Sequence, residues 1–230
     1  MKPVKIALAV CEGRLVPPTK AERGREYCCR DCKKLLVVKK GNIRRHHFAH
    51  KVEEGSCGGG MGNLHKLAQE WVKQCIDDHL RDGCPAPKFL VKCRYCKTER
   101  THTIPRDSSE VEIESPFGQG RKLDVAVLSA GRETLFGIGI LDKSPVKEDK
   151  EQELNRTGLR WVELDAEATV WSGEPHWDSR RSSPLLLGCS CRASKSLWAA
   201  ARVVGWVALG DVGVGVLSFL LSFGRKQRKK

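Results

Sequence analysis

Two closely spaced pairs of metal-binding side chains constrain this chain more than any other feature. The pairs are Cys29 with Cys32 and His47 with His50, and fourteen residues separate them. Structural zinc sites hold the ion between four thiolate or imidazole ligands, and a C-x2-C pair on a tight turn can close such a site with an H-x2-H pair. The spacing therefore predicts a structural Zn²⁺ ion bound by Cys29, Cys32, His47 and His50. Cys28 and His46 are adjacent residues of the same ligand types, so which cysteine and which histidine bind the ion stays open.

The charge of the chain predicts an anionic partner. Its 230 residues include 41 lysines and arginines against 28 acids, a net charge of +13. Residues 171–230 contribute ten basic and three acidic side chains, so more than half of the excess lies in the last part of the chain. An excess of this size is typical of proteins that bind nucleic acid, and an anionic membrane surface is the rival partner.

The cysteines indicate a reducing compartment. Eleven of them, an odd number, occur as C-x2-C pairs and single residues, unlike the dense even set of a small secreted domain. In the first twenty residues, Lys2, Lys5 and Glu12 interrupt a short apolar run that lacks the length of a secretory signal. We therefore expect a cytoplasmic protein.

Hydrophobic periodicity predicts two folded regions. A hairpin around Glu12 and Gly13 and a strand over 35–40 would form a ribbon-like zinc module over residues 1–57, in which metal supplies much of the folding free energy. Apolar residues at helical spacing predict a helix over 64–80. A second domain over 62–168 would combine it with strands over 89–91, 111–114, 123–128, 135–141 and 159–164 and a helix over 147–157. This order of elements is that of an α/β or α+β fold.

A second C-x2-C pair, Cys93 and Cys96, could form half of another zinc site. The nearby candidates for the other half are Cys84, Cys75 and His102. Buried thiols without metal are the alternative, because cysteine is among the side chains most often buried.

Residues 169–230 differ in composition from the rest and could lack folded structure. The segment 203–223 has no charge except Asp211 and is long enough to span a membrane. Asp211 would cost about 2.5–3.5 kcal/mol at the bilayer centre, and four glycines weaken the helix further. We therefore favour a membrane-surface or partner-binding segment, or an unfolded extension, over a membrane anchor.

Five segments of the chain resemble the CoiA-like competence protein family. They are residues 22–29, 41–50, 63–65, 121–125 and 158–164. Members of this family join an N-terminal zinc module to a nuclease-like domain of the PD-(D/E)xK kind. The resemblance covers residues 1–168 and implies a zinc-ribbon-like module followed by a restriction-endonuclease-like mixed-sheet core.

The resemblance also implies roles for single residues. In such domains, acidic residues on adjacent strands hold Mg²⁺, and a lysine positions the attacking water. Asp124 matches the metal-binding aspartate, and Arg121 and Lys122 before it would contact DNA phosphates. His65 matches a further catalytic position at the start of the helix. The domain could therefore hold Mg²⁺ and bind DNA.

The chain departs from the family pattern in the second half of this site. Gly139 stands where the family has a second carboxylate, and Gln69 stands where a lysine is expected one turn after His65. Alternation along the strand puts Lys143 on the face of Gly139, where it could replace the missing lysine, while Asp142 faces the other way. Help from Glu112 or Glu114 on a neighbouring strand could complete a cation site around Asp124.

Two functions from different classes are consistent with these features. One is a zinc-containing DNA-binding or DNA-processing protein similar to competence-associated nucleases, with a degenerate metal-dependent phosphodiesterase site. The other is a non-catalytic, zinc-scaffolded interaction protein whose basic tail contacts a membrane or an acidic partner. Because of Gly139, the sequence leaves open whether the chain is an enzyme.

Overall fold

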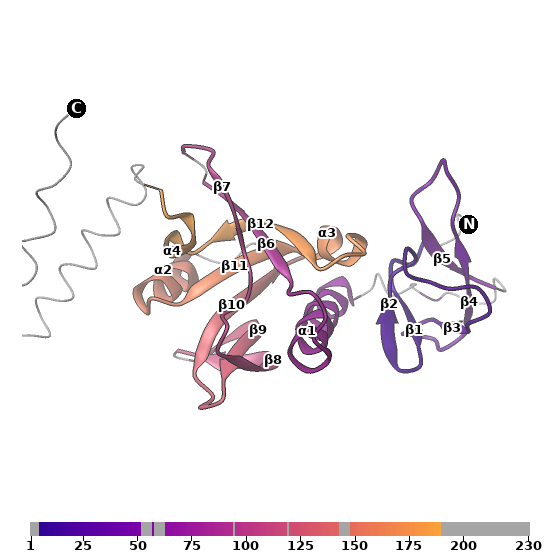
Figure 1. Ribbon diagram of the computed structural model, residues 1–230, viewed down its shortest axis with the longest axis horizontal. Coiled ribbons are helices and arrows are strands. Elements are labelled where there is room, and N and C mark those ends of the chain that lie inside the picture. The colour runs from indigo at the N-terminus through magenta and orange to yellow at the C-terminus, as the bar shows by residue number, and fades with distance from the viewer. Residues whose placement is uncertain are drawn as a thin grey trace, which may run out of the picture.

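A computed structural model of the protein describes residues 5–51, 57, 63–93, 95–118, 120–142 and 148–189. Over these residues the chain forms a small N-terminal sheet and a larger sheet with helices (Figure 1). The predicted catalytic residue Lys143 and the apolar segment 203–223 lie outside the described residues. Within the described part of the chain, no helix is both long and apolar enough to cross a membrane.

The small sheet is antiparallel and built around a short N-terminal hairpin. Its strands are β1 (Ala9–Cys11), β2 (Arg14–Val16), β3 (Tyr27–Cys28), β4 (Leu35–Lys39) and β5 (His47–His50), in the order β2-β1-β3-β4-β5. The hairpin turns at Glu12 and Gly13, which both have positive φ and so allow a tight reversal. Tyr27 and Phe48 stack at 5.1 Å in a core of few residues. Apolar burial of this extent stabilises a separate unit only weakly.

The larger sheet is mixed and has seven strands. Its strands are β6 (Lys88–Lys92), β7 (Glu99–His102), β8 (Ser108–Phe117), β9 (Arg121–Ser129), β10 (Thr134–Leu141), β11 (Arg160–Asp165) and β12 (His176–Ser182), in the order β7-β6-β12-β11-β10-β9-β8. The pairs β10 with β11 and β12 with β6 are parallel, and the others are antiparallel. Helix α2 (Glu148–Arg156) connects β10 to β11 as a crossover. The mixed α/β class expected from the order of elements is confirmed.

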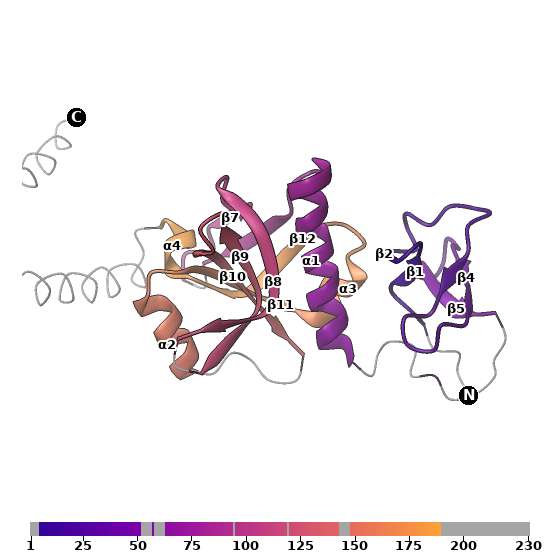
Figure 2. The ribbon, with the colours of Figure 1, turned by 90° about the horizontal axis from the view of Figure 1, so that it is seen from below.

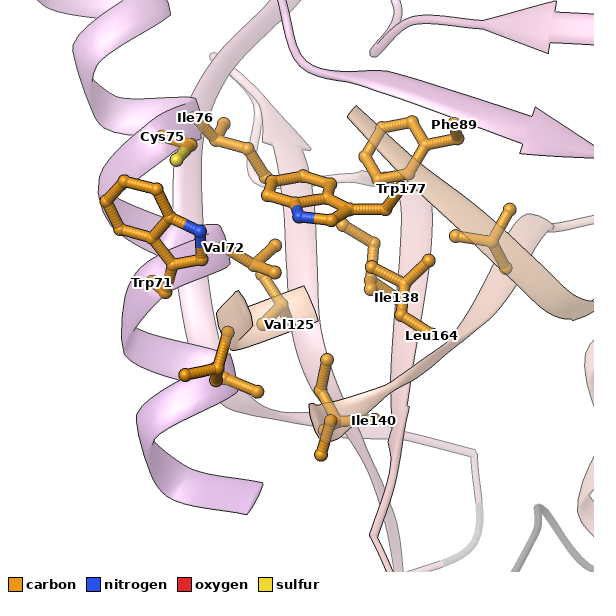
Figure 3. Close-up of a cluster of buried hydrophobic side chains, with 14 of the residues drawn as sticks. Trp71, Val72, Cys75, Ile76, Phe89, Val125, Ile138, Ile140, Leu164 and Trp177 are labelled. Carbon is orange, nitrogen blue, oxygen red and sulfur yellow. The ribbon is translucent and has the colours of Figure 1, made fainter. Parts of the chain in front are cut away.

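Helix α1 (Leu64–Asp82) lies between the small sheet and the larger sheet (Figure 2). It begins where the Asn63 side chain accepts a hydrogen bond from the amide of Lys66, and it ends at Gly83 in the left-handed conformation. Trp71, Val72 and Ile76 belong to the main core, and Val72 and Ile76 extend from the helix toward side chains of the strands (Figure 3). The apolar spacing that predicted the helix thus marks its buried face.

The small sheet docks on α1 through both polar and apolar contacts. The amide of Leu15 donates to Oε1 of Gln74 at 2.7 Å, and the leucine side chain joins the core beneath the helix. The guanidinium of Arg30 donates to Glu70 at 2.6 Å, and both side chains are mostly buried. Charge-assisted hydrogen bonds of this kind are geometrically selective, so they set the orientation of the module on α1.

The larger sheet continues past residue 168, where the sequence analysis ended the second domain. Helix α3 (Ala166–Trp171) covers the sheet beside α1, and β12 follows it into the middle of the sheet, between β11 and β6. Trp177 of β12 is buried against Phe89 at 5.6 Å (Figure 3). Helix α4 (Pro184–Leu187) follows directly after β12. Residues up to 187 are therefore part of this fold.

Candidate metal centres

Four side chains from the small sheet and its flanking loops converge on one point. They are Cys29, Cys32, His50 and Cys57, whose ligand atoms all lie within 4.8 Å of one another. Sγ of Cys29 is 3.7 Å from Sγ of Cys57, and Sγ of Cys32 is 3.2 Å from Nε2 of His50. Two thiolates on a tetrahedral Zn²⁺ ion, each at about 2.3 Å, lie roughly 3.8 Å apart. These residues could hold zinc.

Three of the four members are those expected from the spacing, and the fourth is Cys57 rather than His47. The histidine pair lies in strand β5, where residues three apart face opposite sides. His50 faces the cysteines, whereas the ring Nδ1 of His47 lies 2.9 Å from the carbonyl oxygen of Arg45. The C-x2-C signal located half of the group, but an H-x2-H pair can chelate one ion only if a turn or helix brings both rings together.

The two thiols of the C-x2-C pair ionise differently in the metal-free chain. Burial raises the pKa of Cys29 to about 11. Burial also opposes ionisation of Cys32, but the amide of Lys34 and hydrogen bonds with Cys57 and His50 outweigh it and lower the Cys32 pKa to about 7. The surroundings of Cys32 therefore favour its thiolate form even without a metal ion. A bound cation would favour the thiolate form of the others as well.

A second group of thiols lies at the far edge of the larger sheet. It consists of Cys93, Cys96 and Cys189, with their sulfur atoms within 4.8 Å of one another. The candidates expected to join Cys93 and Cys96 lie elsewhere: Cys75 is buried in the main core, and Nε2 of His102 is 2.8 Å from the carbonyl oxygen of Leu186. None of the ten described cysteines is in a disulfide.

A third group combines two carboxylates with an imidazole at the start of α1. It consists of His65, Glu114 and Asp124, again within 4.8 Å of one another. Nε2 of His65 lies 3.4 Å from Oδ1 of Asp124, whose other carboxylate oxygen accepts a 2.6 Å hydrogen bond from the amide of Ile140. Asp124 thus has a carboxylate neighbour on β8, although Gly139 supplies none on β10.

A local change in the backbone of β8 turns Glu114 toward α1. Its φ of +56° lies in the left-handed region, which costs a side chain with a Cβ about 1–2 kcal/mol. The residues on either side of it pair regularly with Val125 and Leu123 of β9, but Val125 belongs to the core under α1 and Leu123 to the core under α2. Glu114 and Asp124 therefore lie where the regular alternation of side chains between the two faces of the sheet is interrupted. Backbone strain is often retained at functional positions.

Gln69 joins the members of this group. Its amide donates to Oε1 of Glu114 at 2.6 Å and lies 3.1 Å from Nε2 of His65, and the residue is only 3% exposed. It stands one helical turn after His65, where the sequence comparison expected a lysine. An amide supplies a donor there but no positive charge.

Strand β10 turns toward His65 the face that carries Asp142, whereas the face that carries Gly139 was expected there. Ile138 and Ile140 belong to the core under α1, so alternation puts Asp142 on this face and Gly139 on the other. The charge of Asp142 also raises the pKa of His65, as expected for a carboxylate on this face. A carboxylate at position 139 would lie on the face away from His65.

The two residues expected to contact DNA have different surroundings. Arg121 is held by two carboxylates of α2, at 2.7 Å from Asp149 and 3.0 Å from Glu153. The Lys122 side chain is 60% exposed, and its Nζ lies 3.7 Å from Oε2 of Glu114. Lys122 is thus the cation closer to the carboxylate group. Glu112, the other candidate on β8, is bonded to Arg132 and Ser115 instead.

The hydrogen bond to Asp124 raises the pKa of His65, although burial acts in the opposite direction. In the presence of a chelator, we expect an NMR titration to give a pKa above the ordinary value of 6.5. Protonated His65 then stabilises the fold at pH values below its unfolded pKa, and this stabilisation is lost as the pH rises through its folded pKa. Asp124→Asn should lower the His65 pKa, and Asp82→Asn at the other end of α1 should not change it. A His65 pKa at or below 6.5 would contradict this account.

One family model matches the chain. It is described as "Competence protein CoiA, N-terminal domain" and covers residues 18–58, which include Cys29, Cys32, His50 and Cys57. No curated protein and no solved structure matches the chain. The resemblance to this family is thus confirmed for the segment that carries the first metal centre: residues 18–58 match the N-terminal domain of competence protein CoiA.

Proposed function

We propose that the chain is a DNA-binding protein whose larger sheet is a restriction-endonuclease-like core with a weakened site for metal-dependent phosphodiester hydrolysis. The observation that carries the proposal is the convergence of Asp124, Glu114 and His65. The second carboxylate comes from Glu114 of β8, which has a strained backbone with a φ of +56°.

The donor set fits a divalent cation. Two carboxylates with one imidazole suit Mn²⁺ better than Mg²⁺, because Mg²⁺ favours oxygen ligands and imidazole suits transition metals. When bound, such a cation polarises the phosphoryl group and activates water. The amide of Gln69 holds the Glu114 carboxylate in place. Without a cation, protonated His65 balances the charge of Asp124, and the imidazole would release that proton to bind a cation.

The same residues explain why hydrolysis would be inefficient. A catalytic lysine expected one turn after His65 is replaced by Gln69, which cannot supply a positive charge. Lys122, beside Glu114 and mostly exposed, is positioned to contact a phosphate. The net charge of +13 supports an anionic partner, and zinc thiolates favour a cytoplasmic, reducing setting.

The deciding assay incubates the full chain with single- and double-stranded DNA and either Mn²⁺ or Mg²⁺. We expect salt-sensitive binding, slow cleavage with Mn²⁺, and a rate about 100-fold lower for Asp124→Asn. Glu114→Gly should lose cleavage without loss of stability, because glycine adopts a φ of +56° at little cost. Asp82→Asn, a substitution at the other end of α1, serves as the control. Cleavage that survives Asp124→Asn, or absence of DNA binding, would refute the proposal.

A second function is favoured by the internal pairing of this group. His65, Asp124, Glu114 and Gln69 satisfy one another, and Arg121 is held by Asp149 and Glu153. A cluster paired in this way could serve only to fix α1 on the sheet in a non-catalytic, zinc-scaffolded interaction protein. In that case the DNA assay gives neither binding nor cleavage, and Asp124→Asn lowers the free energy of unfolding instead.

A further inference from the structure

The second C-x2-C pair repeats two backbone hydrogen bonds of the first. In the first, the amide of Cys29 donates to the carbonyl of Lys34 at 2.9 Å, and the amide of Lys33 donates back to the carbonyl of Cys29 at 2.9 Å. In the second, the amide of Cys93 donates to the carbonyl of Thr98 at 2.9 Å, and the amide of Lys97 donates back to Cys93 at 3.0 Å. The two turns therefore repeat the same pair of hydrogen bonds at the same spacing.

The repetition extends to an unusual backbone angle. The residue after the second cysteine is a lysine in each turn, Lys33 and Lys97, and each has a φ of +59°. Only five described residues other than glycine have positive φ, so these turns account for two of them. A residue with a side chain rarely adopts this angle unless the surroundings require it. In both turns, the angle folds the chain so that the two cysteines of the pair face one point.

The end of the described chain brings a third thiol to the second turn. Helix α4 lies beside β7 in both views (Figures 1 and 2), and it ends at Gly188 in the left-handed conformation. The Arg100 guanidinium donates to the carbonyl of Gly188 at 3.2 Å, and His102 contacts the carbonyl of Leu186. These contacts from β7 place Cys189 next to the turn, with its Sγ 3.6 Å from that of Cys93.

We propose that Cys93, Cys96 and Cys189 bind a second structural zinc ion, which joins the C-terminal end of the fold to the β6–β7 hairpin. The sulfur separation of 3.6 Å is close to the roughly 3.8 Å of two thiolates on one tetrahedral zinc ion. It is far from the ~2.05 Å of a disulfide. Three thiolates leave one position of a tetrahedral zinc ion for a further ligand.

The surroundings of the three sulfurs suit a structural site. Cys93 is completely buried and Cys96 is exposed, so an ion would have a protected side and a path of entry. A metal bond here would close a loop between residues 96 positions apart, and closing long loops restricts the unfolded chain most.

Zinc content per chain tests this proposal. The full chain, purified under reducing conditions, should contain two zinc ions by elemental analysis, and Cys96→Ser and Cys32→Ser should each contain one. Cys84→Ser, which removes an exposed cysteine outside both groups, should keep two. Two zinc ions in Cys96→Ser would overturn the proposal, as would a single ion in the wild type that Cys96→Ser retains.

A ligand exchange keeps the test decisive if a serine variant misfolds. Cys96→His retains a zinc ligand at the exposed position and should keep both ions. Cobalt loaded into Cys32→Ser should give the visible absorption of a tetrahedral thiolate site, and Cys96→Ser in that background should abolish it. Cobalt absorption that persists in the double variant would contradict a role for Cys96.

Discussion

The Cys57→Ser protein will lose the zinc ion of the small sheet and with it the order of β3 to β5, whereas His47→Ala will keep both. Cys57 lies 3.7 Å from Cys29 within the four-member group, while the ring of His47 contacts the carbonyl of Arg45 instead. Binding of structural zinc contributes about 10–16 kcal/mol in small zinc modules. The few core residues of the small sheet cannot replace that contribution.

The loss should be confined to one part of the protein. Leu8 and Leu15 belong to the core under α1, so the β1–β2 hairpin should stay docked when zinc is removed. Zinc analysis combined with limited proteolysis distinguishes the two variants, and new cleavage is expected between residues 20 and 51 in Cys57→Ser alone. Equal zinc loss in His47→Ala would contradict this assignment. Addition of a strong chelator to the wild type should give the same cleavage as Cys57→Ser.

A chain truncated after Ala168 will fail to form the larger sheet. The truncation removes β12, which pairs with β11 on one side and with β6 on the other. Without it, the β6–β7 hairpin loses its attachment to the rest of the sheet, and Phe89 loses its contact with Trp177. A gap in the middle of a sheet exposes two strand edges and much of the apolar core at once, so we expect aggregation or loss of cooperative unfolding.

A chain truncated after Cys189 is the matched control, because it keeps every strand of the larger sheet. It should unfold cooperatively in a thermal melt followed by circular dichroism. In the full chain, Trp177→Ala should lower the free energy of unfolding by about 3–5 kcal/mol, the usual effect of deleting a buried tryptophan. Cooperative unfolding of the chain that ends at Ala168 would show that β12 is dispensable.

Elements with a strong periodic pattern were predicted closely from the sequence. Helix α1 was expected over 64–80 and runs from Leu64 to Asp82, and the strand expected over 135–141 is β10. Helix α1 buries one face along its length, and β10 is an apolar run buried on both faces, so their hydrophobic residues indicate their conformation. Strand β12 was missed because its sequence, His176 to Ser182, has one buried large residue among polar ones. Strand β12 is held by backbone hydrogen bonds to β11 and β6, and these do not require a particular pattern of side chains.

The chemistry of the metal centres was visible in the residue types, but their membership was not. Cys29 and Cys32 are neighbours along the chain, so their spacing alone implies a shared ion. Cys57 lies in a run of glycines that resembles a linker, and Cys189 follows Cys93 by 96 positions, so neither has a local spacing to reveal it. The exclusion of His47 depended on β5 being a strand.

The carboxylate site shows the same division. Asp124 was identified from the resemblance to the CoiA-like family, whereas the choice between Glu112 and Glu114 depended on a single backbone angle at Glu114. Local spacing and periodicity therefore specify the C-x2-C pairs, helices α1 and α2 and the order of the main strands within the sequence itself. Tertiary structure alone selects the fourth zinc ligand, the middle strand of the sheet and the partner of Asp124. These depend on contacts between residues far apart in the chain, which form only when the whole sheet closes.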